Sequence, residues 1–152
     1  MASQTVFKRY EKKYFLTAEQ EAEFLKRIEG KMELDKYGEC TICNIYFDTD
    51  DFDLVRTSIE KPMYKEKLRL RTYGVPKDAE HRAFVEIKKK FDGVVYKRRA
   101  EMTLGEAEDY LYRGIHPEAD SQIIRELDWF LKSNPVKPAV YLAYDRRAFA
   151  GV

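Results

Sequence analysis

Positive charges occupy every second position of one short stretch of this sequence, YKEKLRLRTYG at residues 64–74. Alternate side chains of a β-strand point to opposite faces of a sheet, so such a period of two is typical of a strand. The stretch therefore predicts a strand, residues 63–73, with one basic face and one largely apolar face. The basic positions are Lys65, Lys67, Arg69 and Arg71, and the apolar positions between them include Leu68 and Leu70.

Two further segments, residues 82–91 and 94–102, repeat this two-faced pattern. They flank Asp92-Gly93, a dipeptide typical of two-residue hairpin turns. We therefore expect neighbouring antiparallel strands whose apolar face is covered by helices and whose other face is basic. The polar positions of the second and third strands are Glu86, Lys88, Lys90, Lys97, Arg99 and Glu101.

The rest of the chain predicts an α+β domain of six strands and four helices spanning residues 1–152. Strands are expected at 5–16, 40–49 and 138–149, and helices at 17–30, 50–60, 103–114 and 120–132. Thr17 and Thr103 are the expected N-caps of two helices. Trp129, in the last helix, is expected in the core.

The charge is distributed unevenly along the chain, although the formal net charge is only +1. Residues 61–99 hold 13 Lys or Arg against 5 Asp or Glu, a net of +8, and the remainder holds 15 against 22, a net of −7. This indicates a localised anion site. Like charges about 7 Å apart repel by only ~0.6 kcal/mol in water, so a solvated basic surface remains an equally open interpretation.

Several classes of site are disfavoured by the composition. Cys40 and Cys43 are three positions apart, so on a strand their side chains point to opposite faces and do not suit a shared metal ion. They are expected to be buried thiols. No apolar run reaches the roughly 18 residues of a membrane span, and the N-terminus lacks a signal-peptide core. We therefore expect a cytoplasmic chain without a membrane segment. Nucleic acid is not an expected partner, because no RNA-binding or cold-shock aromatic signature accompanies the cations; nucleic-acid binding through the basic face, with Tyr73 and Tyr96, is the least favoured alternative.

Six short motifs then follow one another along the chain: EKKYFL at 11–16, IYFDT at 45–49, KLRLRTYG at 67–74, FVEIK at 84–88, YKRR at 96–99 and YDRRAF at 144–149. Together they resemble the VTC domain, the polyphosphate polymerase domain of vacuolar transporter chaperone proteins and their bacterial relatives. That family belongs to the CYTH-like triphosphate tunnel metalloenzymes.

The resemblance implies a closed antiparallel β-barrel, or tunnel, lined by Lys, Arg and Glu with helices packed outside. This sequence stops at Val152, before further strands of the family, so a C-terminally truncated, partial barrel is expected. A second copy of the chain could complete that barrel as a homodimer. The resemblance also implies transfer of the γ-phosphoryl group of ATP to polyphosphate, with Mn²⁺ or Mg²⁺ as cofactor. A non-catalytic polyphosphate- or triphosphate-binding module and a triphosphate hydrolase are the alternatives.

The resemblance also assigns roles to individual residues. Those implied to bind phosphate are Lys13, Arg69, Arg71, Lys88, Lys97, Arg99 and Arg146, and Arg69, Arg71 and Lys88 are also the catalytic candidates. Glu86 and Glu11 are the metal candidates. Salt bridges that space the cations are the alternative role of these two glutamates. Tyr46 and Asp48 are expected to line the tunnel, to pack in the core or to cap a turn.

Overall fold

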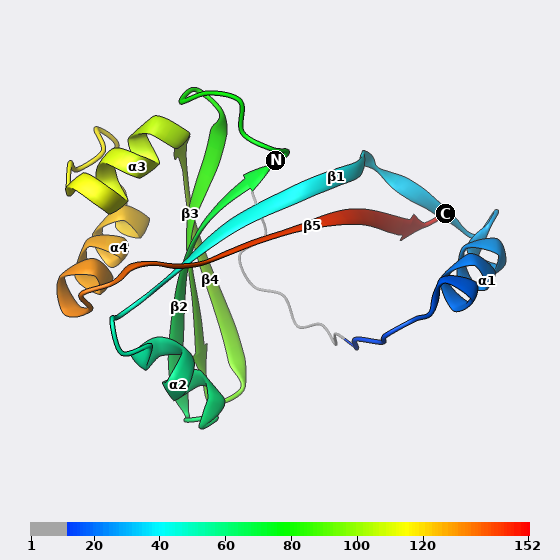
Figure 1. Ribbon diagram of the computed structural model, residues 1–152, viewed down its shortest axis with the longest axis horizontal. Coiled ribbons are helices and arrows are strands. Elements are labelled where there is room, and N and C mark those ends of the chain that lie inside the picture. The colour runs from blue at the N-terminus through cyan, green and yellow to red at the C-terminus, as the bar shows by residue number, and fades with distance from the viewer. Residues whose placement is uncertain (1–11) are drawn as a thin grey trace. The chain divides into compact units, whose positions relative to one another are not determined.

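The computed structural model describes residues 12–152 and shows an α+β fold, as the sequence predicts (Figure 1). In chain order, the elements are α1 (Ala18–Ile28), β1 (Met32–Asp48), α2 (Asp53–Ile59), β2 (Tyr64–Tyr73), β3 (Arg82–Phe91), β4 (Val94–Thr103), α3 (Leu104–Arg113), α4 (Gln122–Ser133) and β5 (Lys137–Gly151). No helix within residues 12–152 is both long and apolar enough to cross a bilayer.

The strands form one sheet in the order β4-β3-β2-β1-β5. The pairs β1–β2, β2–β3 and β3–β4 are antiparallel, and the Asp92-Gly93 hairpin joins β3 to β4 as expected. Both of its residues adopt positive φ angles, 44° and 78°, which such a turn requires. The sheet is open, with β4 and β5 at its edges, so the described strands form a partial barrel and not a closed tunnel.

The chain divides into two compact units, each of which is described by itself. The larger is Thr41–Tyr144, and the smaller combines the described residues up to Cys40 with Asp145–Val152. In the smaller unit, Thr17 caps α1 in a capping box with Gln20, as predicted. Arg147 forms an ion pair with Glu21 on α1 in the same unit.

A hydrophobic core lies between the sheet and the helices α3 and α4, both of which lie on one side of β2, β3 and β4 (Figure 1). The sheet contributes the side chains at its predicted apolar positions, and each of the two helices contributes the apolar side chains along one of its faces. Thr103, the last residue of β4, caps α3 and forms the expected capping box with Glu106. The helices therefore cover one face and leave the basic positions on the other. The core residues include Leu68, Leu70, Val85, Ile87, Ala107, Tyr110, Ile124, Leu127 and Phe130.

Three predictions about the fold are wrong or concern, in part, residues outside the described range 12–152. Residues 12–16 form no strand, and the rest of the strand expected at 5–16 lies outside the described residues. β1 begins at Met32 instead of residue 40, because its polar first half has no apolar alternation to reveal a strand. Trp129 is not in the core but 71% exposed. It lies two residues after buried Leu127, about 200° around the helix, and therefore points to the opposite side.

Candidate functional site

Strand register gathers the predicted basic positions of β2, β3 and β4 on one side of the sheet. Arg69 lies opposite Glu86, which lies opposite Arg99. In the next row, Lys67 lies opposite Lys88, which lies opposite Lys97. We call this surface the cation face; it comprises Lys65, Lys67, Arg69, Arg71, Glu86, Lys88, Lys90, Lys97 and Arg99.

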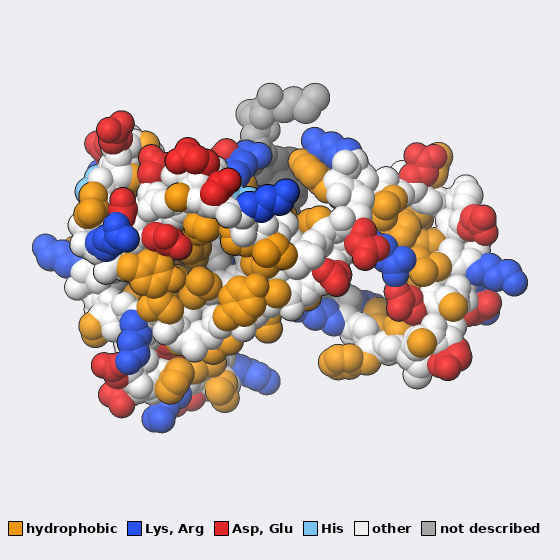
Figure 2. Space-filling view, turned by 45° about the horizontal axis from the view of Figure 1, so that its top comes forward, with side chains coloured by type: hydrophobic (Ala, Val, Ile, Leu, Met, Phe, Trp, Pro, Cys, Tyr) orange, Lys and Arg blue, Asp and Glu red, His pale blue; other side chains and the backbone are white. Residues whose placement is uncertain are grey.

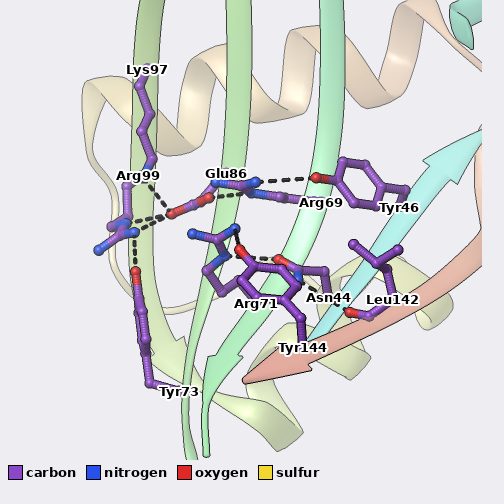
Figure 3. A network of polar contacts seen from close by, with 10 residues as sticks. All are labelled: Asn44, Tyr46, Arg69, Arg71, Tyr73, Glu86, Lys97, Arg99, Leu142 and Tyr144. Atoms are coloured by element: carbon purple, nitrogen blue, oxygen red, sulfur yellow. Dashed lines mark hydrogen bonds and ion pairs between the residues drawn. The ribbon is translucent and has the colours of Figure 1, made fainter. Parts of the chain in front are cut away.

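Glu86 lies at the centre of the cation face and is shared by three cations (Figure 3). The carboxylate is only 1% exposed. Its Oε2 accepts a hydrogen bond from Arg69 Nε, and its Oε1 lies 2.9 Å from Lys97 Nζ and 2.6 Å from Arg99 Nε. Burial by itself raises the pKa of Glu86. The charges of Arg69, Lys97 and Arg99 and the hydrogen bond from Lys97 outweigh this effect and lower the pKa to about 2. Glu86 is therefore an ionised counter-charge for its three neighbours.

This pKa predicts acid sensitivity with a definite sign. The pKa of Glu86 falls on folding from its ordinary value of 4.5 to about 2. Its stabilising effect is thus complete above about pH 4.5 and is lost as the pH falls towards 2, a loss of about 3 kcal/mol. Urea unfolding across this window should show the free-energy difference between the wild type and Glu86→Gln shrinking with acidification. A difference that is constant with pH would contradict the assignment.

Aromatic side chains hold the two arginines that pair with Glu86. Arg69 Nη1 donates to Tyr46 Oη at 3.2 Å, and Arg99 Nη2 donates to Tyr73 Oη at 2.8 Å. The Arg99 guanidinium also lies 4.5 Å from the ring centroid of Phe84. Burial raises the pKa of Tyr73, but hydrogen bonds and charge from Arg99 and Arg71 lower it overall. The guanidinium groups are thus fixed in position by neutral partners as well as by Glu86.

Arg71 is the most buried cation of this face and has a different environment. It is 7% exposed. Its Nε donates to Asn44 Oδ1 at 2.8 Å and its Nη2 to Tyr144 Oη at 3.3 Å (Figure 3). Asn44 in turn donates to the Leu142 carbonyl at 3.2 Å. The hydrogen-bond partners of Arg71 are neutral, and among residues 12–152 its guanidinium forms no ion pair with a carboxylate.

Asn44 and Tyr144 are site residues that the sequence did not reveal as such. Asn44 is 1% exposed and is the amide within the otherwise apolar CTICNIYF stretch. A single polar residue within an apolar strand is a usable signal, because buried amides need partners. Tyr144 begins the YDRRAF motif, but only the placement of β5 beside β1 brings it to Arg71.

The lysines of the cation face repel one another. Lys65 donates from Nζ to the Ser58 carbonyl at 3.1 Å. Burial, followed by the charges of four lysines, lowers the pKa of Lys65. Like charges directly opposite each other on neighbouring strands are destabilising. In the part of the chain that the structure describes, the sheet provides Lys97 with Glu86 but provides no carboxylate for three others: Lys67, Lys88 and Lys90.

The structure thus brings together five of the seven predicted phosphate ligands, namely Arg69, Arg71, Lys88, Lys97 and Arg99. The remaining two belong to the other unit. Lys13 is exposed and precedes α1. Arg146 lies beside Arg147 and Asp145 in a shallow pocket that Glu21 and Glu39 also line. Glu11 lies outside the described residues.

The surroundings of Glu86 do not fit a metal ion. Both of its oxygens face guanidinium or ammonium groups, which repel a cation. No cluster of three potential metal ligands occurs among the His, Cys, Asp and Glu side chains of residues 12–152. Asp48 caps a turn, since it accepts hydrogen bonds from the backbone N–H groups of Leu54 and Val55 at the start of α2. Cys43 is a buried free thiol, as expected, and Cys40 is a partly buried one.

Comparison with known families matches the chain to a family model. The family model for the VTC domain matches residues 8–152, a range that contains the whole cation face together with α1 and β5. No curated protein matches the chain.

Proposed function

Since the chain belongs to the VTC domain family, we propose that its cation face binds the phosphates of ATP and of a polyphosphate chain and transfers the γ-phosphoryl group between them. The VTC domain is associated with polyphosphate polymerase function. The single observation that carries the proposal for this chain is the environment of Arg71, a buried guanidinium whose hydrogen-bond partners within residues 12–152 are neutral.

A buried charge is costly unless it is paired. Arg71 uses Nε and Nη2 for Asn44 and Tyr144, and in the proposal other N–H groups of its planar fork donate to an oxyanion. Guanidinium forks match phosphate oxygens in a bidentate manner. A bound phosphate would therefore supply the charge that Arg71 lacks.

The rest of the cation face supplies positioning and charge. Arg69, Lys97 and Arg99 share one carboxylate, so this cluster keeps a net positive charge of two. Phosphoryl transfer depends mainly on positioning and charge neutralisation. In the proposal, Arg69, Arg71 and Lys88 contact the transferred group. Lys67 and Lys97, in the row of Lys88, bind the neighbouring phosphates of the chain.

A second function, phosphate-chain binding without turnover, is favoured by the saturation of Glu86. A carboxylate that already balances three cations cannot also hold Mn²⁺ or Mg²⁺, so we derive no metal-dependent step from this site. A homodimer that joins a second copy to an edge of the described sheet, at β4 or β5, also remains a prediction.

One experiment separates these functions. The protein is incubated with ATP and Mn²⁺ or Mg²⁺, and long-chain polyphosphate and free phosphate are assayed in parallel. Synthesis of chains supports the proposal, whereas phosphate without chains indicates a hydrolase. Because the proposal places side chains and not a metal against the phosphates, tripolyphosphate binding is expected to persist in EDTA even if turnover stops. Tighter binding of an oligonucleotide than of tripolyphosphate at matched salt would overturn the proposal.

A further inference from the structure

Hydrophobic side chains are exposed between charged ones on the face drawn in Figure 2. Six large exposed hydrophobic residues lie near the hairpin that joins β3 to β4. We call this group the hairpin tip. Tyr64 lies opposite Phe91, which lies opposite Val94, and the Asp92 N–H donates to the Met63 carbonyl at 2.9 Å. The group is Met63, Tyr64, Phe91, Val94, Val95 and Tyr96, each between 44% and 67% exposed.

Tyr64, Phe91, Val94 and Tyr96 of the hairpin tip continue the apolar face of the sheet beyond the helices that cover it, whereas Val95, opposite Lys90, lies on the side of the cation face. The border is a set of ion pairs in which Lys89 Nζ lies 3.7 Å from Glu66 and 3.5 Å from Glu126 of α4. Arg98 Nε lies 3.3 Å from the same Glu126 carboxylate. The hydrophobic core lies on one side of this border. On the other side, the apolar residues of the same strands are exposed to solvent. Contiguous exposed apolar residues of this kind mark binding surfaces.

The segments that form the hairpin tip are rich in lysine, although Lys65, Lys88, Lys90 and Lys97 belong to the cation face. Residues 61–66 and 88–97, which form it, contain six lysines but only two carboxylates, Glu66 and Asp92, a formal net charge of +4. Glu66 is already engaged with Lys89. A second copy of the chain would bring the same positive charge to this surface, and like-charge juxtaposition opposes such an interface.

We propose that the hairpin tip docks on an anionic lipid surface. Phe91, Val94 and Tyr96 enter the region between headgroups and acyl chains, and the surrounding lysines contact lipid phosphates. Apolar side chains bordered by Lys are the combination that binds such interfaces, through burial of apolar area and attraction to negative lipids. Lysine stems can also extend along an apolar surface while their ammonium groups stay at headgroup level. None of the three inserting residues belongs to the cation face, but four of the six lysines do, so lipid docking and phosphate binding share these cations.

Vesicle sedimentation tests the proposal. Wild-type protein is expected to sediment with vesicles containing phosphatidylserine and not with phosphatidylcholine alone. Val94→Ser should weaken this binding about fivefold, because an apolar side chain no longer enters the interface. The matched control is Val140→Ser on β5, since Val140 is 51% exposed and Val94 50%. Binding that Val94→Ser leaves unchanged, or weakens no more than Val140→Ser, overturns the proposal.

A fluorescent reporter distinguishes insertion from charge attraction. In a Trp129→Phe background, Val94→Trp is expected to shift its emission to shorter wavelength on adding phosphatidylserine vesicles and to be quenched by brominated acyl chains. Vesicle binding without a shift or quenching of the tryptophan emission overturns insertion. Self-association of the wild type without vesicles, if Val94→Ser abolishes it, also overturns the proposal. Tripolyphosphate binding by Val94→Ser should match the wild type, so failure of this proposal and failure of the proposed function give different results.

Discussion

Arg71→Ala is expected to weaken tripolyphosphate binding by about 3 kcal/mol, roughly a hundredfold, because charge-assisted bidentate hydrogen bonds are lost. The melting temperature should change little. The substitution strands the buried Asn44 amide, but it also removes a guanidinium whose hydrogen-bond partners are all neutral. Isothermal titration calorimetry measures the first effect and a thermal melt the second.

Two further variants sharpen this test. Arg71→Lys keeps the charge but loses the fork and should bind with intermediate affinity. Arg113→Ala is the control, since Arg113 pairs with Asp109 on the exposed surface of α3, and it should leave binding unchanged. If Arg71→Ala binds normally but melts far below the wild type, Arg71 is structural and the phosphate site is wrongly placed.

Glu86→Gln is expected to destabilise the fold at neutral pH by about 3 kcal/mol, because removing one member of a buried ion cluster leaves its partners uncompensated. The substitution preserves shape and removes the charge that Arg69, Lys97 and Arg99 share. Tripolyphosphate should then raise the melting temperature of the variant more than that of the wild type, since bound phosphate replaces the missing negative charge. Differential scanning fluorimetry with and without tripolyphosphate measures both effects.

The control for Glu86→Gln is Glu101→Gln. Glu101 lies on β4 and pairs with Arg82, but its side chain is 52% exposed, and exposed pairs contribute at most about 1 kcal/mol. Its loss should therefore be small. Should Glu86→Gln fold as stably as Glu101→Gln while tripolyphosphate binding becomes insensitive to added Mn²⁺, Glu86 would be a metal ligand and not a counter-charge.

The parts of this molecule that were predictable from sequence are those encoded by local periodicity. The alternation in residues 63–102 gave the three strands, their apolar side and the basic residues of the cation face, and Asp92-Gly93 gave the hairpin between two of them. Local pattern also located Thr17 and Thr103 as caps, because a capping box involves residues only three apart.

Features that depend on register or on distant strands were not accessible in this way. Glu86 balances both Arg69 and Arg99 only because three strands align at that row. Asn44 and Tyr144 meet Arg71 from segments far apart in the chain. The first half of β1 carries no apolar alternation, and the face of α4 on which Trp129 lies depends on which stripe of that helix packs against the sheet.

Thr103 joins the strand that carries Lys97 and Arg99 directly to α3, with no residue between the end of one element and the start of the other. The next two backbone N–H groups, of Leu104 and Gly105, donate to the carbonyls of His81 and Ala79 at 2.8 Å each. Such a junction has no hinge, so the helix cannot swing without moving the strand. The position of the Arg99 guanidinium is consequently set when the core forms, and the proposed polyphosphate ligand would meet a preorganised surface whose ordering entropy was lost during folding.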